Sequence, residues 1–278
     1  MPADPPSRHP AFLLAARFLF PLRDQPDAET SPALAKAAAW LPVWGLAIGI
    51  LYTLVYRVAW RWFGEQQHLR LLPPMILLIA DFGWFGYRQL AAAIAVFKRA
   101  PPASATGELR LPGATAVLLI GLLKYLLLLA LPAGAMAFNA DWRQYLSVLY
   151  PGVIYRPLVL MPLWGRWAMM LAFSIGRVAP GGSERLRHLA GGTRLLAIGG
   201  WWFIAGPLTV AYTSPEPVHL AYGVVIALGV LVVAYLASFA LARRYDGQTE
   251  TTVLAAGLIG ELAFLMFYLP IARTIYWY

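Results

Sequence analysis

The sequence contains no cysteine in its 278 residues. This absence excludes disulfide bonds, thiolate metal sites and cysteine nucleophiles. Charged residues are also scarce, at 13% of the chain, whereas soluble domains carry about a quarter. The first apolar stretch, AFLLAARFLFPL, has no clean small-residue cleavage site and runs straight into RDQPDAET, so no secretory signal peptide is expected. These absences leave a chain that is 60% hydrophobic.

Long apolar runs account for most of that composition. A run such as AVLLIGLLKYLLLLALPAGAMAF can cross about 30 Å of hydrocarbon, which takes about 20 helical residues. Backbone groups in lipid must be satisfied internally, so the spans are helices or a closed barrel. The runs are too continuously apolar for barrel strands of about 10 alternating residues. We therefore predict an all-α fold, a polytopic transmembrane bundle of about seven helices (six to eight).

The arrangement of the spans follows from the apolar runs and the loop charges. Residues 1–36 are expected to form an N-terminal cytoplasmic or interfacial segment and 37–278 a single transmembrane domain. The predicted spans are 37–56, 74–96, 113–136, 152–176, 194–213, 218–242 and 253–274. Loops on one side hold twelve lysines and arginines and the opposite loops hold four, which marks the first side as cytoplasmic. The expected location is the cell (inner) membrane, as a multi-pass protein with the N-terminus in the cytoplasm and the functional site facing the cytoplasm.

The net charge of +9 is read as a signal of topology rather than of nucleic-acid binding, because the basic residues are spread over short loops. Around residues 10–20 we expect a short interfacial or partly inserted helix, with Arg17 and Arg23 near the depth of the lipid phosphates.

Few charged side chains lie inside the predicted spans, and each has two interpretations. A carboxylate in hydrocarbon costs a few kcal/mol, so Glu261 either binds a cation or anchors a site, or it is a protonated or arginine-paired structural acid. Asp81 either serves a site or pairs with Arg88, seven residues later. Arg166 suits a phosphate ligand, or it pairs with Glu261 or Asp81. Lys124 is expected to pair with an acid within the membrane.

The polar stretch DGQTET precedes the last span. Asp-Gly favours a turn, and Thr249 or Thr251 is expected to cap the helix that follows. The free N–H groups at that helix start suit an anion, which makes Gln248 and Thr249 candidate substrate-binding residues. Arg110 and Arg177, in two other loops on the predicted cytoplasmic side, are candidate phosphate contacts; otherwise they are ordinary loop charges.

Three patches resemble the cobalamin synthase family, the adenosylcobinamide-GDP ribazoletransferases. They are KAAAWLPVWGLAIG at 36–49, LVLMPLWGRWAMM at 158–170 and DGQTETTVLAAGLIGELAFL at 246–265. The residues that match are Trp40, Pro42, Gly45 and Gly49 in the first patch, Pro162, Arg166, Trp167, Ala168 and Met169 in the second, and Gly247, Thr249, Thr252, Ala255, Glu261 and Leu262 in the third. Their order and spacing also fit the family.

The resemblance implies a reaction, in which adenosylcobinamide-GDP is joined to α-ribazole or its 5′-phosphate with release of GMP and with Mg²⁺ as cofactor. It also exposes a departure, because most of the family's acids are missing. The family segment H-L-D-G-L-A-D-T-x-D-G corresponds to LIADFGWFGYRQLAAA, in which Asp81 stands for one acid. Trp84, Phe85 and Arg88 stand near the places of the others, and none of these three can bind a metal.

The later motifs depart in the same direction. In the terminal patch the family's Gly-Asp is represented by Glu250 and Thr251, and the first of its two glutamates is Leu258. The family's K-D-S-R-x-G segment corresponds to GELRLPG, in which Glu108 and Arg110 are counterparts.

The first functional hypothesis is therefore a divergent transferase of this family. The candidate residues are Glu261 and Arg166 for catalysis, Arg110, Arg177, Gln248 and Thr249 for substrate binding, and Asp81, Glu108, Glu250 and Glu261 for the metal. The second hypothesis is a non-catalytic relative, kept as a partner subunit or ligand-binding scaffold. The third is a small transporter. Membrane lipid is an expected partner, nucleic acid is not, and a homo- or hetero-oligomer is left open.

Overall fold

The computed structural model describes residues 10–20, 33–64, 66–98, 113–131, 154–213 and 220–276. Regular structure in these ranges is helical, apart from one parallel bridge between Val178 and Gln248. Four stretches are long and apolar enough to cross a membrane, which indicates a multi-pass membrane protein. They are Leu34–Gly64, Leu195–Thr213, Leu220–Arg244 and Glu250–Arg273. The prediction of an all-α chain with membrane spans is confirmed at this level.

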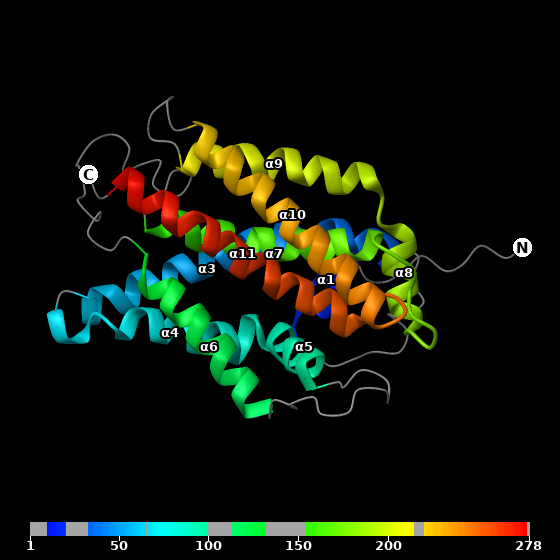
Figure 1. Ribbon diagram of the computed structural model, residues 1–278, viewed down its shortest axis with the longest axis horizontal. Helices are drawn as coiled ribbons and strands as arrows, with labels where there is room; N and C mark the ends of the chain where they lie inside the picture. Colours follow the sequence, from blue (N-terminus) through cyan, green and yellow to red (C-terminus); the bar gives the residue numbers. More distant parts are fainter. Residues whose placement is uncertain are drawn as a thin grey trace, which may run out of the picture.

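The helices follow one another along the chain from α1 to α11, and Figure 1 labels most of the α-helices. They are α1 (Ala11–Leu19), α2 (Leu34–Ala37), η2 (Ala38–Trp40), α3 (Leu41–Ala59), η3 (Trp60–Gly64), η4 (Gln67–Leu69), α4 (Leu72–Ala80), η5 (Asp81–Phe85), α5 (Tyr87–Lys98), α6 (Gly113–Leu129), α7 (Tyr155–Ser174), α8 (Glu184–Gly192), α9 (Leu195–Thr213), α10 (Leu220–Arg244) and α11 (Glu250–Tyr276). Helix α8 and the turn between α10 and α11 lie at one end of the bundle, referred to below as the α8 end (Figure 1).

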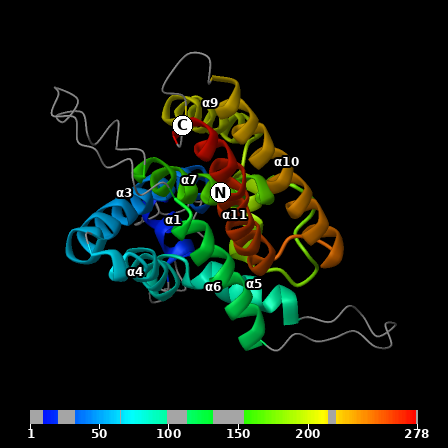
Figure 2. The same ribbon diagram turned by 60° about the vertical axis from the view of Figure 1, so that its left-hand side comes forward.

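Helix α7 is the centre of the bundle. Each of its residues except Ser174 is buried, and it contacts α3, α11, α9 and α10. Figures 1 and 2 show α9 and α10 on one side of it and α3, α4 and α6 on the other. The indole N–H groups of Trp164 and Trp167 donate to Thr209 Oγ1 at 2.9 Å and to the Ile198 carbonyl at 3.1 Å, both on α9. A helix surrounded in this way can carry polar groups that lipid would not tolerate.

Small residues let α3 approach α7 closely. A Cβ added to Gly45 would lie 2.6 Å from the carbonyl oxygen of Pro162, and one added to Gly49 would lie 2.5 Å from that of Val159. Neither position has room for a side chain, so the two backbones meet directly. Close backbone contact of this kind is how membrane helices gain packing energy, because lipid supplies no hydrophobic driving force between them.

The segment predicted as one span at 74–96 is broken in the structure. Helix α4 ends at Ala80, a π-helical turn runs from Asp81 to Phe85, and α5 begins at Tyr87. The Gly86 N–H donates to the Asp81 carbonyl at 2.6 Å across this break. Irregular backbone at membrane depth is tolerated where protein covers it, and Asp81 is 1% exposed.

Helix α1 packs one face against the rest of the bundle. Five of its side chains are 0–4% exposed: Leu14, Ala15, Ala16, Phe18 and Leu19. The ring of Phe12 stacks on Trp44 of α3 at 4.5 Å, and Trp44 Nε1 donates to the Phe12 carbonyl at 3.0 Å. Arg23, which is predicted to lie near the depth of the lipid phosphates, is outside the described residues.

The α3–α7 contact gives a first prediction. Gly49→Ala inserts a methyl group against the Val159 backbone and should destabilise the protein by about 1–3 kcal/mol, the usual cost of overpacking. Thermal unfolding of the detergent-solubilised protein, followed by tryptophan fluorescence, measures the change. Gly200→Ala in α9 is the matched control, because a Cβ there meets nothing within 4 Å. Equal melting temperatures for the two variants would contradict the close approach.

Candidate functional site: a buried chain of charges

Four charged side chains meet in the middle of the bundle. Asp81 comes from η5, Lys124 from α6, Arg166 from α7 and Glu261 from α11. Lys124 Nζ lies 2.5 Å from Asp81 Oδ2 and 2.6 Å from Glu261 Oε2. Arg166 Nη1 donates to the other carboxylate oxygen of Glu261. Tyr52 of α3 donates its hydroxyl to Asp81 Oδ1, which closes the chain at that end.

The four charges alternate in sign along the line of contacts from Asp81 to Arg166. Each of the four side chains is 0–1% exposed. An isolated charge in such a place costs several kcal/mol even after relaxation, so burial requires a partner and hydrogen bonds for the remaining lone pairs. Here two acids and two bases cancel, and both oxygens of each carboxylate accept a hydrogen bond. The arrangement is a closed unit that needs no further ion for neutrality.

These contacts decide several of the pairings predicted from the sequence. The prediction that Lys124 pairs with an acid is confirmed, and it pairs with two buried ones. Of the two partners named for Arg166, the structure shows Glu261. The pairing of Asp81 with Arg88 is wrong. The π-helical turn between them directs Asp81 into the core, and Arg88 pairs with Glu250 instead.

A Mg²⁺ ion does not fit this donor set. Magnesium requires about six oxygen ligands in near-ideal geometry, whereas the oxygens of Asp81 and Glu261 are already engaged by Tyr52, Lys124 and Arg166. No group of three or more His, Asp or Glu side chains in the described ranges is placed to hold a metal ion. Glu250 is eleven residues before Glu261 on the same helix, about 16 Å along its axis, and Glu108 lies outside the described residues.

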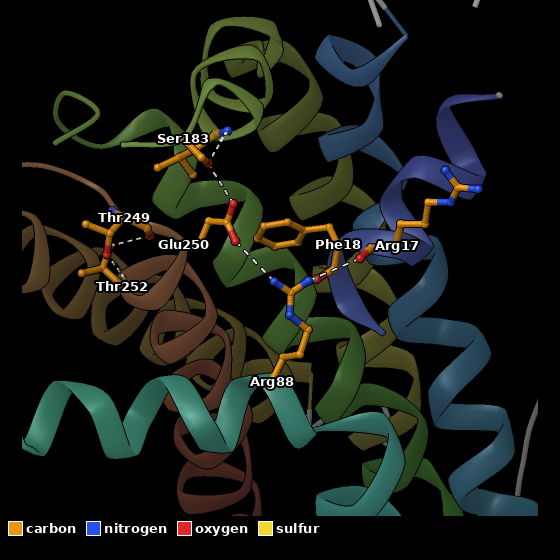
Figure 3. A network of polar contacts seen from close by, with 8 residues as sticks. Arg17, Phe18, Arg88, Ser183, Thr249, Glu250 and Thr252 are labelled. Atoms are coloured by element: carbon orange, nitrogen blue, oxygen red, sulfur yellow. Dashed lines mark hydrogen bonds and ion pairs between the residues drawn. The ribbon is translucent and has the colours of Figure 1, made fainter. Parts of the chain in front are cut away.

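A second polar network lies at the α8 end (Figure 3). Arg88 Nη2 lies 3.3 Å from Glu250 Oε2, and Ser183 Oγ donates to Glu250 Oε1 at 2.9 Å. Arg88 Nη1 also donates to the carbonyl of Phe18, at 2.5 Å, and to that of Arg17, at 3.3 Å. These carbonyls end α1, where a cation opposes the negative end of the helix dipole. One guanidinium therefore joins α1, α5 and α11.

The candidate substrate-binding residues differ in what they do. Gln248 is buried, and its amide donates to the carbonyls of Ile175 and Ser238 and accepts from Thr252 Oγ1 at 2.7 Å. Thr249 caps α11: its Oγ1 accepts from the Thr252 N–H at 3.1 Å. Gln248 and Thr249 therefore hold the turn between α10 and α11. Arg177 is exposed at the same end, and Arg110 lies outside the described residues.

The backbone geometry of the turn between α10 and α11 explains why Gln248 and Thr249 are held by so many hydrogen bonds. Asp246 and Gly247 have φ values of 54° and 137°, and a Cβ on Gly247 would lie 2.6 Å from the Ala179 N–H nitrogen. The chain thus passes directly over the segment that precedes α8, and the Ala179 N–H donates to the Gln248 carbonyl at 2.9 Å. Of the predicted capping residues, Thr249 is confirmed.

Tyr52 and Gln89 are two of the buried polar residues that the sequence does not single out; others are Arg156, Thr209, Thr213 and Ser238. Both stand in apolar helical segments, and both are at most 2% exposed. A hydroxyl or amide group in a span usually faces another helix. This tendency is the one feature of the sequence that indicates a buried position for Tyr52 and Gln89. No model of a protein family, no curated protein and no solved structure matches this chain.

The four paired side chains Asp81, Lys124, Glu261 and Arg166 are called the charge chain below. Their pairing predicts how strongly substitutions of its members destabilise the protein, alone and in combination. Lys124→Met leaves Asp81 without a cationic partner and should destabilise the protein by about 3–5 kcal/mol. Adding Asp81→Asn leaves Glu261 paired with Arg166 and should recover a large part of that loss. A double-mutant cycle on melting temperatures measures the coupling, with the exposed Arg194→Gln as control. Simple additivity of Lys124→Met and Asp81→Asn would refute the pairing.

The α8-end network predicts unequal effects for its two charges. Arg88→Met removes the ion pair and also the hydrogen bonds to the end of α1, so it should cost about 1–2 kcal/mol. Glu250→Gln removes only the partly exposed ion pair, which is worth at most about 1 kcal/mol. Chemical denaturation of both purified variants tests the difference. If Glu250→Gln is the more damaging change, Arg88 does not hold α1.

Proposed function

We propose that this chain is a membrane protein of the cobalamin synthase type that lacks Mg²⁺-dependent transferase activity and acts as a partner subunit or ligand-binding scaffold. The observation that carries the proposal is the closed pairing of Asp81 and Glu261 with Lys124 and Arg166. Carboxylates that would hold the metal in a transferase are here part of a neutral structural unit.

The family assignment within this proposal draws support from where the three resembling patches lie. Gly45 and Gly49 of the first patch pack on the backbone of the second, in α7. Arg166 of the second patch is bonded to Glu261 of the third. Segments that are far apart in sequence and resemble one family therefore meet in one place, as they would if they derive from a common bundle.

The lack of transferase activity follows from electrostatics. Charge that builds on a transferring phosphorus and on its leaving group must be neutralised, and Mg²⁺ held by carboxylates does so in such chemistry. To bind the metal, Glu261 would have to release both Lys124 and Arg166, and each would then be a buried cation with a weakened partner. The side chains of Gln248 and Thr249 likewise make their hydrogen bonds within the protein.

The transferase remains the second candidate, favoured by one observation. The Glu250 side chain keeps 29% of its surface exposed, at the end of the bundle that also presents the exposed Arg177, whose guanidinium suits a phosphate. The transporter hypothesis was suggested by the intramembrane charges, and their mutual pairing accounts for them without transport.

The deciding experiment is an assay of membranes that contain the protein. They are supplied with adenosylcobinamide-GDP and α-ribazole, and GMP release is measured with and without Mg²⁺. We expect release no greater than in membranes without the protein, while an active cobalamin synthase in matched membranes serves as positive control. Metal-dependent GMP release that disappears in Glu261→Gln would overturn the proposal and establish the transferase.

A further inference from the structure

Gln89 is an unusual side chain for the core of a membrane bundle. It is 2% exposed, and neither its amide nitrogen nor its amide oxygen has a hydrogen-bond partner among the described residues. A buried amide without partners costs roughly 1–3 kcal/mol, and native proteins satisfy nearly all such groups with protein, ordered water or a ligand. Neither the charge chain nor the α8-end network explains why the Gln89 amide is buried without hydrogen-bond partners.

The position of Gln89 is defined by α11 and α7. A Cβ placed on Gly257 would lie 2.7 Å from Gln89 Nε2 and 2.5 Å from Met169 Cε. The absence of a side chain at Gly257 is what lets the amide reach the α11 backbone. Gly257 is one helical turn before Glu261 and about two turns after Glu250. Gln89 thus stands between the buried charge chain and the α8 end, next to Arg88 of the α8-end network.

We infer that Gln89 anchors a binding site, between α5, α7 and α11, for a small neutral molecule that both donates and accepts hydrogen bonds. Neutrality follows from the surroundings: glutamine carries no charge, and the neighbouring acids and bases neutralise one another. A primary amide offers two N–H donors and one carbonyl acceptor, which an alcohol, an amide group or water complements. We place its entrance toward the α8 end, where the neighbouring Arg88 keeps 23% of its side chain exposed.

This inference deepens the ligand-binding role proposed above, but it can fail separately, because its test measures access to Gln89 rather than GMP release. The chain has no cysteine, so a single introduced thiol reports one position. Gln89→Cys and Ala93→Cys are compared in membrane vesicles with a charged, water-soluble methanethiosulfonate reagent added from the α8 side. Ala93 is the matched control: it lies on the same helix, is 6% exposed and packs with Ile120 and Leu258.

The thiolate attacks such reagents, forming a mixed disulfide and releasing methanesulfinate, and it forms only where water reaches the sulfur. We expect Gln89→Cys to react at least about tenfold faster than Ala93→Cys. Equal rates overturn the inference. Acetamide then distinguishes the occupants in Met169→Cys, which keeps Gln89 and places a thiol beside it: protection from labelling identifies a site for a solute larger than water, and unchanged labelling identifies a water site.

A second measurement keeps the inference testable if Gln89→Cys does not fold. Gln89→Leu has a similar size but no polar atoms. If the amide is satisfied by a bound neutral molecule, this change loses those hydrogen bonds and should lower the melting temperature by about 2–4 °C. If the amide is dry and unpaired, removing it relieves a buried polar group and the melting temperature rises, which overturns the inference.

Discussion

The interaction on which the structure depends is the alternation of charge in the line Asp81, Lys124, Glu261 and Arg166. None of the four could be buried alone, because each would carry an uncompensated charge in a medium of low dielectric. Together they form a neutral unit, and that unit requires α6, α7, α11 and the η5 turn to be placed so that their side chains meet. Tyr52 adds α3 to the same set. A hydrophobic pattern determines which segments enter the membrane, whereas this chain of contacts determines how they are arranged around α7.

The break between α4 and α5 is best understood from the same requirement. In an uninterrupted helix, residues seven apart lie near one face, so Asp81 and Arg88 would project together. The π-helical turn at Asp81–Phe85 separates them. Asp81 then reaches Lys124 in the core, and Arg88 reaches Glu250 and the end of α1 at the α8 end. A local irregularity thus lets one short segment serve two polar networks. A Cβ on Gly86 would lie 2.7 Å from Asp81 Oδ1, so a side chain there would have to displace the Asp81 carboxylate.

Sequence patterns predicted the helical class, the presence of several membrane-spanning helices and the kind of partner that Lys124 requires, because those properties follow from hydropathy and from the cost of buried charge. They did not predict which acid pairs with which base. Arg88 and Glu250 are 162 positions apart, and their contact depends on the rotation and depth of two separate helices. The broken span was also missed, since a π-helical turn leaves the apolar pattern of residues 74–96 intact. Gln248 was assigned to a ligand because a polar residue beside a helix start suits an anion, yet tertiary contacts use all of its amide.

The position of Lys124 also bears on whether a metal ion could bind beside Asp81 and Glu261. An ammonium group and a divalent cation compete for the same carboxylate lone pairs, and the ammonium is covalently attached, so it loses no translational freedom on binding. A metal would have to displace Lys124 from two carboxylates and leave its charge in the core, at a cost of several kcal/mol for an unpaired buried ion. Arg166 adds a second such cost at Glu261. The two basic side chains therefore stabilise the acids as structural elements and, by the same contacts, oppose the chemistry that acids in such a place would otherwise support.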